Sequence, residues 1–556
     1  MKRQYAIQFT IGGVQDFIAA SRKIWDLWSG SFLISYLTAQ AIKAIIKDQR
    51  CARILSSKAA NEEAGQCADI IFPNPENPLI KQNSGNAIFR TSIPNKFLAL
   101  AECEESDIKE VCVNLENKVR ERYGSLLSVP MNNIDSLKDL PETEKKELAA
   151  AESEWIECYW LAKELDQEMI EKLKNETTRK KAVAELQKSL GLEVAMLKNY
   201  RTVLSHQVHE KETRGEQDKC SLCGKRVARK KCKEHEKLCL NCYAKRKINE
   251  TIPKCENIRN NGKPTHLDNV STRDFAKDKY YAIYQADGDS MGDIVSEDPE
   301  GLSKLLLDFS NAVWAKEPEK PEESGTWKKT TLIYCGGDDV LYFSDVKSVL
   351  DIACETNELF KSKVQFDGKK MHMSAGIHIS HNKESMALAL ENARRAEKAS
   401  KDAGKDRFTI SVDKRSGDFV SWTADSWDMA LDFKFMVNVF KKDDVSTALY
   451  HNLRDELSVF AGDQGGITQD DKIEVPEEQL RNRMEYILNR RFIGENNKED
   501  KKKAIKRIID KFPLETKKDL WNLMDFLEIA TFFARINGKE PMYPGITEND
   551  IKEKAK

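Results

Sequence analysis

One short stretch, YCGGDDVLYF at residues 334–343, constrains the fold of this chain more than any other feature. Apolar residues stand on both sides of two glycines and two aspartates, a pattern that predicts two strands joined by a tight turn. The turn carries adjacent carboxylates, Asp338 and Asp339. Two interpretations are open at this point: an ordinary acidic turn, or the tip of a hairpin that holds metal ions for phosphate chemistry.

The residues around this hairpin follow a mixed pattern that predicts an α/β unit of the ferredoxin-like type. The expected order is a strand at 280–287, a helix at about 301–316, the hairpin, a helix at about 346–362, a strand at 372–380, an amphipathic helix from about 386, and a closing strand at 407–412. The N-terminal part repeats the pattern, with a strand at 5–11, one long helix at about 14–46, strands at 68–73 and 87–100, and a helix at 107–124.

The predicted fold class is therefore α+β, with two ferredoxin-like domains, a helical insert and a C-terminal helical domain. A chain of 556 residues is too long for a single core, and we expect four domains: 1–103, with part of the following helix, 104–275, 276–422 and 423–556. The formal net charge is only −2, so any surface for nucleic acid must be local. No signal peptide or apolar run of membrane length is evident, which predicts a cytoplasmic protein without a membrane partner.

A second acidic group follows the strand that ends at Asp287. Asp287 and Asp289 are two residues apart, so both can project to the same side if the strand persists. In a ferredoxin-like sheet the first strand lies beside the hairpin, which would bring Asp287 close to Asp338 and Asp339. Clustered carboxylates repel one another unless a cation neutralises them, and Mg²⁺ prefers oxygen ligands. The arrangement predicts Mg²⁺ or Mn²⁺ ions that activate a hydroxyl group and stabilise a leaving pyrophosphate.

Small and basic residues near these carboxylates suit a triphosphate. Gly336 and Gly337 would let it lie against the turn. A basic set follows the helix that begins near residue 386, consisting of Arg394, Arg395, Lys398, Lys401 and Lys405. Lys401 and Lys405 lie nearest the helix end and are the best candidates to reach a triphosphate. The alternative, a solvated helix face, stays open.

Four cysteines form two C-x-x-C pairs, Cys220 with Cys223 and Cys239 with Cys242, and 15 residues separate the pairs. This spacing predicts a structural zinc site, because each pair can occupy one edge of a tetrahedron and no position remains for water. Cys232 and His235 lie between the pairs as less favoured ligands. Residues 219–247 hold eleven Lys or Arg against two Glu, which suits either an acidic or RNA partner or a solvated basic loop.

Taken together, these residues resemble one family, the large palm-containing subunit of type III CRISPR–Cas effector complexes, and most closely its Cmr-type (III-B) branch. The resemblance is carried in order by the following motifs: IGGVQDFIAASRKIWDLWSGSFLISYL (11–37), SIPNKFLAL (92–100), ADGDSMGDIV (286–295), GGDDVLYF (336–343), MSAGIHISH (373–381) and KRSGDFVSW (414–422). It covers nearly the whole chain and implies two palm domains of the polymerase and cyclase type, a zinc-bearing helical insert and a C-terminal helical domain.

The resemblance also implies an activity. Family members join ATP into cyclic oligoadenylate messengers when their complex binds foreign RNA, so the expected partners are other Cmr-type subunits, guide RNA and target RNA. By this resemblance Asp287, Asp338 and Asp339 hold the metals, with Asp289 nearby. The residues expected to contact nucleotides are Ser290, Met291 and Gly292 in the second palm, and Asn95 and Lys96 in the first.

One feature departs from the family pattern. Many members begin with a nuclease domain that bears a His-Asp metal motif, and the dipeptide HD occurs nowhere in this sequence. DNA cleavage by this chain is therefore not expected.

Three other functions stay open. The same palm chemistry joins AMP to S-adenosylmethionine in a subset of relatives. A catalytically inactive RNA-binding scaffold is another interpretation, although the intact acidic set argues against it. A free-standing cyclic dinucleotide synthase is less compatible with the zinc insert and the second palm.

Overall fold

The computed structural model describes residues 1–55, 66–81, 91–199, 218–232, 235–252, 280–316, 326–441, 448–462, 471–491, 499–536 and 542–553. Contacts within the chain divide it into two compact units. The first comprises Met1–His266, Ser290–Tyr342 and Glu358–Met371, and the second comprises Leu267–Asp289, Phe343–Asn357 and His372–Lys556.

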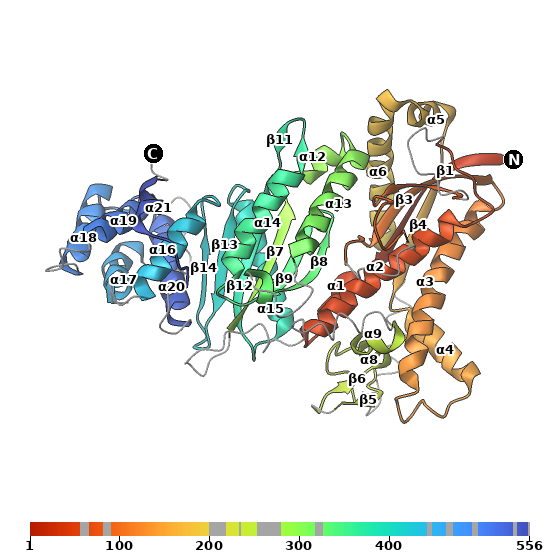
Figure 1. The fold of residues 1–556 in the computed structure, drawn as a ribbon. Coiled ribbons are helices and arrows are strands. Elements are labelled where there is room, and N and C mark those ends of the chain that lie inside the picture. Colours follow the sequence, from red (N-terminus) through yellow and green to blue (C-terminus); the bar gives the residue numbers. More distant parts are fainter. Residues whose placement is uncertain are drawn as a thin grey trace. The chain divides into compact units, whose positions relative to one another are not determined.

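The elements are labelled in Figure 1. The strands are β1 (Lys2–Gly12), β2 (Asp69–Phe72), β3 (Lys96–Glu104), β4 (Glu157–Glu164), β5 (Lys230–Lys231), β6 (Lys237–Leu238), β7 (Tyr280–Gly288), β8 (Thr331–Gly336), β9 (Asp339–Ser344), β10 (Gln365–Phe366), β11 (Lys369–Lys370), β12 (Met373–His381), β13 (Phe408–Asp413) and β14 (Phe419–Thr423). The helices in the first half are α1 (Val14–Ala19), α2 (Ile24–Ile46), α3 (Ile108–Met131), α4 (Glu142–Ser153), α5 (Gln167–Lys174), α6 (Glu176–Asn199), α8 (Leu240–Arg246) and α9 (Ile248–Thr251). Those in the second half are α12 (Met291–Val295), α13 (Pro299–Lys316), α14 (Val349–Lys363), α15 (Met386–Asp402), α16 (Met429–Lys441), α17 (Ala448–Ala461), α18 (Glu477–Arg491), α19 (Glu499–Ile509), α20 (Lys517–Ile536) and α21 (Glu548–Glu553), and a 3₁₀ turn spans Thr326–Lys329.

The N-terminal sheet has four strands in the order β2-β3-β1-β4. Strands β1 and β3 pair antiparallel with Phe9 opposite Phe97, and the two rings stack 5.4 Å apart. The sequence does not predict β4, which pairs with the other side of β1 and lies within the range expected to be a helical insert. The expected domain boundary at residue 103 therefore leaves β4 outside the domain that contains the other strands of its sheet. The reason is that most β4 side chains are partly exposed on both faces, so no apolar alternation marks the strand.

The single helix expected at about 14–46 is wrong, because the structure has two helices, α1 and α2, with a break between Ala20 and Lys23. Asp26 stabilises the start of α2, since its carboxylate accepts hydrogen bonds from the backbone amides of Arg22 and Lys23, each 3.3 Å long. Helix α2 is also long and apolar enough, by length and composition, to cross a membrane, contrary to the expectation that no such run exists. However, 72% of its most apolar window is buried inside the protein, as in a core helix, where it packs on α3 and α8.

The second sheet has six strands in the order β14-β13-β12-β7-β9-β8. The four strands β12-β7-β9-β8 have the ferredoxin-like order that the sequence predicts, with the first strand of the unit, β7, beside the second strand of the hairpin, β9. Strand β12 pairs antiparallel with β7 and parallel with β13, and β14 adds an antiparallel edge that the sequence does not predict. Helix α15 packs on β7, β12 and β13.

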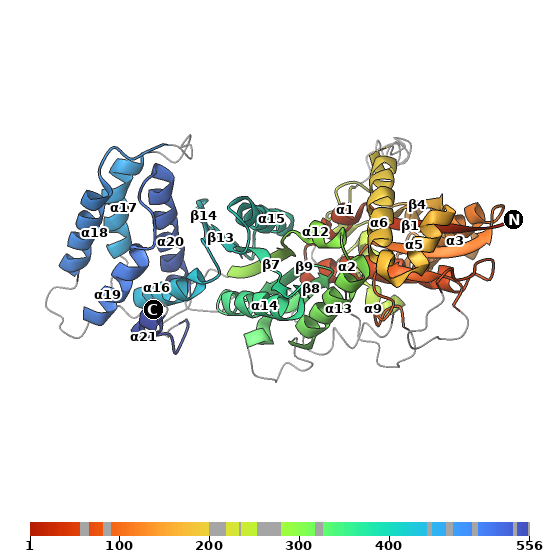
Figure 2. The same ribbon diagram turned by 90° about the horizontal axis from the view of Figure 1, so that it is seen from above.

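The C-terminal region is helical, as expected. Helices α17 and α18 pack together, and α20 contacts both α16 and α17 (Figure 2). Helix α20 also packs on β14, where the fully buried Trp422 stacks on Phe433 at 5.6 Å and meets Phe526 edge-on at 4.9 Å. These rings join the helical region to its sheet in one apolar core.

Candidate functional site

The acidic residues predicted to hold metal come together in the structure. Asp287, Asp338 and Asp339 each offer a carboxylate oxygen, and these oxygens all lie within 4.8 Å of one another. Asp287 lies near the end of β7, while Asp338 lies in the two-residue turn between β8 and β9, and Asp339 begins β9. Gly337 precedes Asp338 with φ = 68°, a left-handed conformation that favours glycine. Three carboxylates at this spacing suit a divalent cation with oxygen ligands.

Asp289 has a different environment from Asp287. Its side chain is buried, and one carboxylate oxygen accepts a hydrogen bond of 2.7 Å from Ser374 Oγ while the other accepts one of 2.9 Å from the Asp406 backbone amide. Asp289 is not part of the group of carboxylate oxygens described above. Its hydrogen bonds connect the end of β7 to β12 and to the loop after α15. Asp289 is therefore a positioning residue for the end of β7.

Lys401 is the basic residue of α15 that reaches the acidic group. Its ammonium pairs with Asp287 and, at 2.6 Å, with Glu397, and all three side chains are less than one-third exposed. Burial lowers the pKa of Lys401, but the hydrogen bonds that its ammonium donates to Asp287 and Glu397 outweigh this effect and leave the pKa raised. Burial raises the pKa of Glu397, and Lys401 partly offsets this. The lysine thus stays charged beside Asp287.

Arg395, Lys398 and Lys405 of this basic set have other surroundings. Arg395 pairs with Glu391 one turn away on α15, and Lys398 is exposed. Lys405 is exposed in the loop after α15, where its backbone has φ = 66° and its amide donates to the Ser400 carbonyl oxygen. A role for Lys405 in phosphate binding remains a prediction.

The residues that follow Asp289 open a short helix. Ser290 precedes α12 with φ = 58°, Met291 is buried, and no atom lies within 4 Å of the place where a side chain of Gly292 would begin. This open backbone is compatible with a nucleotide contact at Gly292, which remains a prediction.

Gly336 has a structural role that the sequence does not predict. A methyl group at this position would lie 2.6 Å from the Ser92 carbonyl oxygen and 2.8 Å from Tyr334 Oη. The neighbouring Thr91 donates its hydroxyl to the Ile333 carbonyl oxygen and accepts a backbone hydrogen bond of 3.2 Å from Cys335. Residues 91–92 therefore run against β8, and the space at Gly336 is filled by this segment.

Asn95 and Lys96, the expected nucleotide contacts of the first domain, lie at the start of β3. The Asn95 side-chain amide donates a 2.7 Å hydrogen bond to the Ile11 carbonyl oxygen, and the Ile11 amide donates to the Asn95 carbonyl oxygen at 2.7 Å. Lys96 is exposed, with its ammonium 6.0 Å from the centre of the Phe72 ring. Asn95 thus extends the pairing of β1 and β3, and a nucleotide contact for either residue remains a prediction.

The four cysteines of the two C-x-x-C pairs form a second cluster. One sulfur from each of Cys220, Cys223, Cys239 and Cys242 lies within 4.8 Å of the others, and three of these residues are buried. Hydrogen bonds from the neighbouring thiols lower the pKa of Cys220. The arrangement fits a tetrahedral four-thiolate site for zinc. Cys232 and His235 are not part of this group, so the structure places neither among the candidate ligands.

Two basic residues near this cluster, Lys245 and Arg246, form contacts inside the protein. Lys245 is 1% exposed, and its ammonium donates to the carbonyl oxygens of Phe17 at 2.8 Å and Ala20 at 2.5 Å. Arg246 pairs with the fully buried Asp26 at 2.7 Å. These contacts, which the sequence does not predict, hold the break between α1 and α2 against α8. The expectation that the basic residues face a partner or solvent is wrong for Lys245 and Arg246.

Comparisons with known proteins agree with this geometry. The family model described as Cas10/Cmr2, second palm domain, matches residues 280–409, and the model described as CRISPR-associated protein Cmr2, N-terminal, matches residues 6–128. A protein of Pyrococcus furiosus described as CRISPR system Cmr subunit Cmr2 is 32% identical over 169 residues, which are 25% of this chain and 19% of that protein. The alignment thus spans less than a fifth of the relative's length.

Solved structures share the fold at low sequence identity. A chain of the type III-B Cmr-beta complex in its apo state matches with a TM-score of 0.56 and 11% identity, over 96% of this chain and 82% of that chain. A chain of the same kind of complex bound to cognate target RNA matches with a TM-score of 0.54 and 11% identity, over 96% and 83% of the two chains. The N-terminal region and the second palm region of this chain are therefore similar to the Cas10/Cmr2 family.

Proposed function

We propose that this chain is the RNA-activated nucleotidyltransferase of a type III CRISPR effector complex and converts ATP into cyclic oligoadenylate messengers. The observation that carries the proposal is the convergence of Asp287, Asp338 and Asp339, whose oxygens lie within 4.8 Å of one another inside the region that matches a second palm domain. The interpretation as an ordinary acidic turn does not explain why a third carboxylate, from a different strand, lies beside the two in the turn. A vestigial scaffold likewise has no need to keep the three together.

In this proposal the three carboxylates hold Mg²⁺ or Mn²⁺. The ions would activate the attacking ribose hydroxyl and stabilise the leaving pyrophosphate. Gly337 gives the hairpin the turn that carries Asp338, and Asp289 fixes the end of β7 through Ser374.

Lys401 balances the charge of Asp287 and lies at the place where a triphosphate would meet the metal ions. The further residues proposed to contact nucleotide are Lys405, Gly336, Gly337, Ser290, Met291, Gly292, Asn95 and Lys96.

We assign zinc to the cysteine cluster. Four thiolates complete a tetrahedron and leave no position for water, so the ion stabilises the insert and has no part in the reaction. The fit is supported by the mutual distances of the four sulfurs. Asn241, between two of the ligands, accepts a 2.7 Å hydrogen bond from Tyr123 of α3, so the zinc site would hold α8 against the helical region.

We propose other Cmr-type subunits, guide RNA and target RNA as the partners, acting with this chain in the cytoplasm. The support is the fold shared with a chain of a Cmr-beta complex bound to cognate target RNA, together with the family match. Since the net charge is only −2, recognition of RNA depends on local surfaces and on the other subunits.

The test is mass spectrometry of the products that the assembled complex forms from ATP, with and without target RNA and S-adenosylmethionine. Cyclic oligoadenylates that need target RNA support the proposal. Products that contain AMP joined to S-adenosylmethionine would show that the same palm chemistry uses S-adenosylmethionine as the acceptor. The absence of any nucleotide product under all conditions would contradict the proposal and favour a scaffold.

A further inference from the structure

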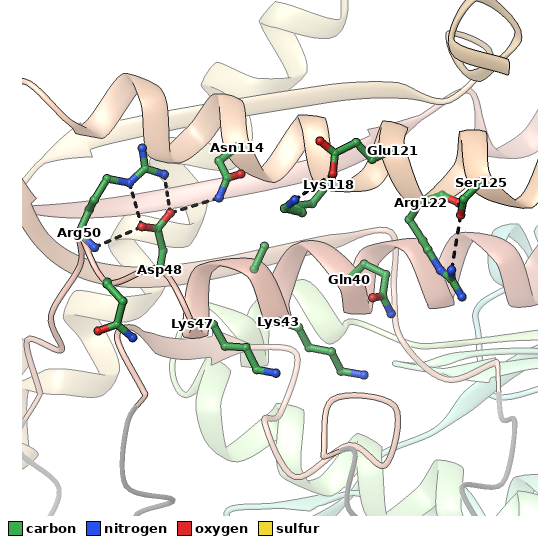
Figure 3. A pocket seen from close by; sticks show the side chains of 12 residues that line it. Gln40, Lys43, Lys47, Asp48, Arg50, Asn114, Lys118, Glu121, Arg122 and Ser125 are labelled. Atoms are coloured by element: carbon green, nitrogen blue, oxygen red, sulfur yellow. Dashed lines mark hydrogen bonds and ion pairs between the residues drawn. The ribbon is translucent and has the colours of Figure 1, made fainter. Parts of the chain in front are cut away.

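A basic pocket lies between the C-terminal half of α2 and the middle of α3, within the first compact unit. Its volume is about 630 Å³, a size typical of ligand sites, and Figure 3 shows the side chains that line it. Five of the lining side chains are basic and two are acidic. They are Lys43, Lys47, Arg50, Lys118 and Arg122, and Asp48 and Glu121.

Both acidic side chains of the pocket are already neutralised. Asp48 accepts a 2.9 Å hydrogen bond from Arg50 Nε and another of 3.3 Å from Asn114. The hydrogen bonds from Arg50 lower the pKa of the Asp48 carboxyl group. Glu121 pairs with Lys118 at 2.8 Å. Arg50 and Lys118 are therefore paired with the acidic side chains of the pocket. The other three basic side chains have no carboxylate partner in the part of the chain that the structure describes.

The three remaining cations have no counter-charge among the described residues. Lys43 and Lys47 are one helical turn apart and extend side by side from α2 (Figure 3), and neither forms an ion pair or side-chain hydrogen bond within the described part of the chain. Arg122 is held by neutral groups: its Nε donates to Tyr36 Oη at 2.8 Å, and its guanidinium lies 5.4 Å from the centre of the Tyr36 ring. It is therefore oriented while its charge stays unbalanced.

Lys43 and Lys47 lie at the C-terminal end of α2, where cations also interact favourably with the helix dipole. The helix dipole does not explain why Lys43 is partly buried, because a fully exposed lysine at this end of the helix would gain the same favourable interaction. Lys43 is half-buried, and burial together with the charge of Lys47 lowers its pKa to about 8. A cation kept in such surroundings is stabilised when an anion enters the pocket.

We propose that this pocket binds phosphate groups, either of a free polyphosphate or of an RNA backbone. The lining chemistry distinguishes phosphate from other anions. Among the described residues that line the pocket, Ala44 is the single apolar one and none is aromatic, so the lining gives an acidic protein segment no large apolar side chain to pack against and a base no ring on which to stack. A phosphate group brings several acceptor oxygens, which can satisfy two ammonium groups and a guanidinium together.

The experiment uses the purified 556-residue chain in buffer without Mg²⁺ or Mn²⁺, so that the result does not depend on the proposed palm chemistry. Binding of inorganic tripolyphosphate is measured by calorimetry, and binding of a labelled single-stranded oligouridylate by fluorescence anisotropy. Polyglutamate serves as the non-phosphate anion. The test variant is Lys43→Gln with Lys47→Gln, and Lys43→Arg with Lys47→Arg restores the charge. The matched control is Lys181→Gln with Lys188→Gln, which removes two exposed charges from α6.

We expect the glutamine pair to weaken binding of at least one phosphate probe by about tenfold or more, while the arginine pair and the α6 control retain the wild-type affinity. Weaker binding of tripolyphosphate alone identifies a free polyphosphate as the ligand. If RNA binding is lost as well, its salt dependence should fall by about 1.4 in logarithmic slope, as for two fewer phosphate contacts on a single strand. Thermal unfolding of each variant shows whether the fold is intact.

Three results would overturn the proposal. The wild-type chain could bind neither phosphate probe, or the glutamine pair could bind both as tightly as wild type. Polyglutamate could also bind as tightly as the phosphate probes and depend on the same lysines, which would identify an acidic protein segment as the occupant.

Discussion

Replacing Asp289 by alanine tests whether Asp287 and Asp289, two residues apart, have the different roles that their contacts indicate. Asp289 is 6% exposed and accepts two hydrogen bonds, from Ser374 Oγ at 2.7 Å and from the Asp406 amide at 2.9 Å. Hydrogen bonds to a charged acceptor each contribute about 1.5–3 kcal/mol. We therefore expect Asp289→Ala to reduce the stability of this part of the sheet by about 3–6 kcal/mol.

The matched variant Asp287→Ala should have a much smaller effect on stability. The Asp287 side chain is 29% exposed and its carboxylate pairs with the 30% exposed Lys401. An ion pair of this partly solvated kind contributes about 0.2–1 kcal/mol. The same variant should nevertheless abolish ATP conversion, because it removes a proposed metal ligand. The two variants therefore differ in the expected loss of stability, which is large for Asp289→Ala and small for Asp287→Ala.

The assay is hydrogen–deuterium exchange of the peptide that contains Asp406, whose amide proton is the one that Asp289 protects. In Asp289→Ala its exchange should accelerate by on the order of 100-fold or more, and in Asp287→Ala by no more than about fivefold. Ser374→Ala removes one of the two hydrogen bonds and should give an intermediate loss of stability. Unchanged exchange in Asp289→Ala, or equal acceleration in both aspartate variants, would refute the assignment of separate roles.

Three further predictions concern the acidic cluster, the cysteine cluster and the residues around them. Asp338→Ala with Asp339→Ala should abolish ATP conversion without changing thermal unfolding or RNA binding, because both residues lie at a turn and do not pack in the core; full product formation would exclude the proposed metal site. Cys220→Ser with Cys223→Ser should release zinc and lower the melting temperature, since structural zinc contributes folding free energy; finding no zinc in the intact protein by metal analysis would contradict the assignment. Lys245→Met should destabilise the chain by about 2–6 kcal/mol in chemical denaturation, because it leaves the buried carbonyl oxygens of Phe17 and Ala20 without this donor, and an unchanged unfolding midpoint would show that the buried ammonium is dispensable.

The parts of the structure that the sequence predicts are those set by local pattern and by topology. Strand β7 and the hairpin β8–β9 have clear apolar runs, and the ferredoxin-like order then requires Asp287 to lie near Asp338. The cysteine cluster follows from spacing alone, since two C-x-x-C pairs suffice to complete a tetrahedron. In each case the prediction depends on a few neighbouring residues, or on a strand order to which there are few alternatives.

The features that the sequence does not predict depend on partners far along the chain. The break between α1 and α2 has no proline or glycine to mark it, and it is stabilised by Lys245 and Arg246, more than 200 residues away. Strand β4 is recognisable only by its pairing with β1, because its own side chains show no alternation. Local periodicity carries no information about such contacts.

The two glycines of the GGDD turn illustrate the same limit at the site itself. In the sequence they are equivalent, and both suit a phosphate that approaches the backbone. In the structure Gly337 adopts φ = 68°, a conformation that favours glycine, and no atom lies within 4 Å of the place where a side chain would begin. Gly336 is required for a different reason, because the backbone of Ser92 occupies the space that a side chain would need. The space beside Gly337 is thus open on the side where we propose that a phosphate lies, whereas residues 91–92 pack against β8 at Gly336. That packing places the segment before β3 directly against the strand that leads to Asp338, so the first domain helps to position the carboxylates on which the proposed reaction depends.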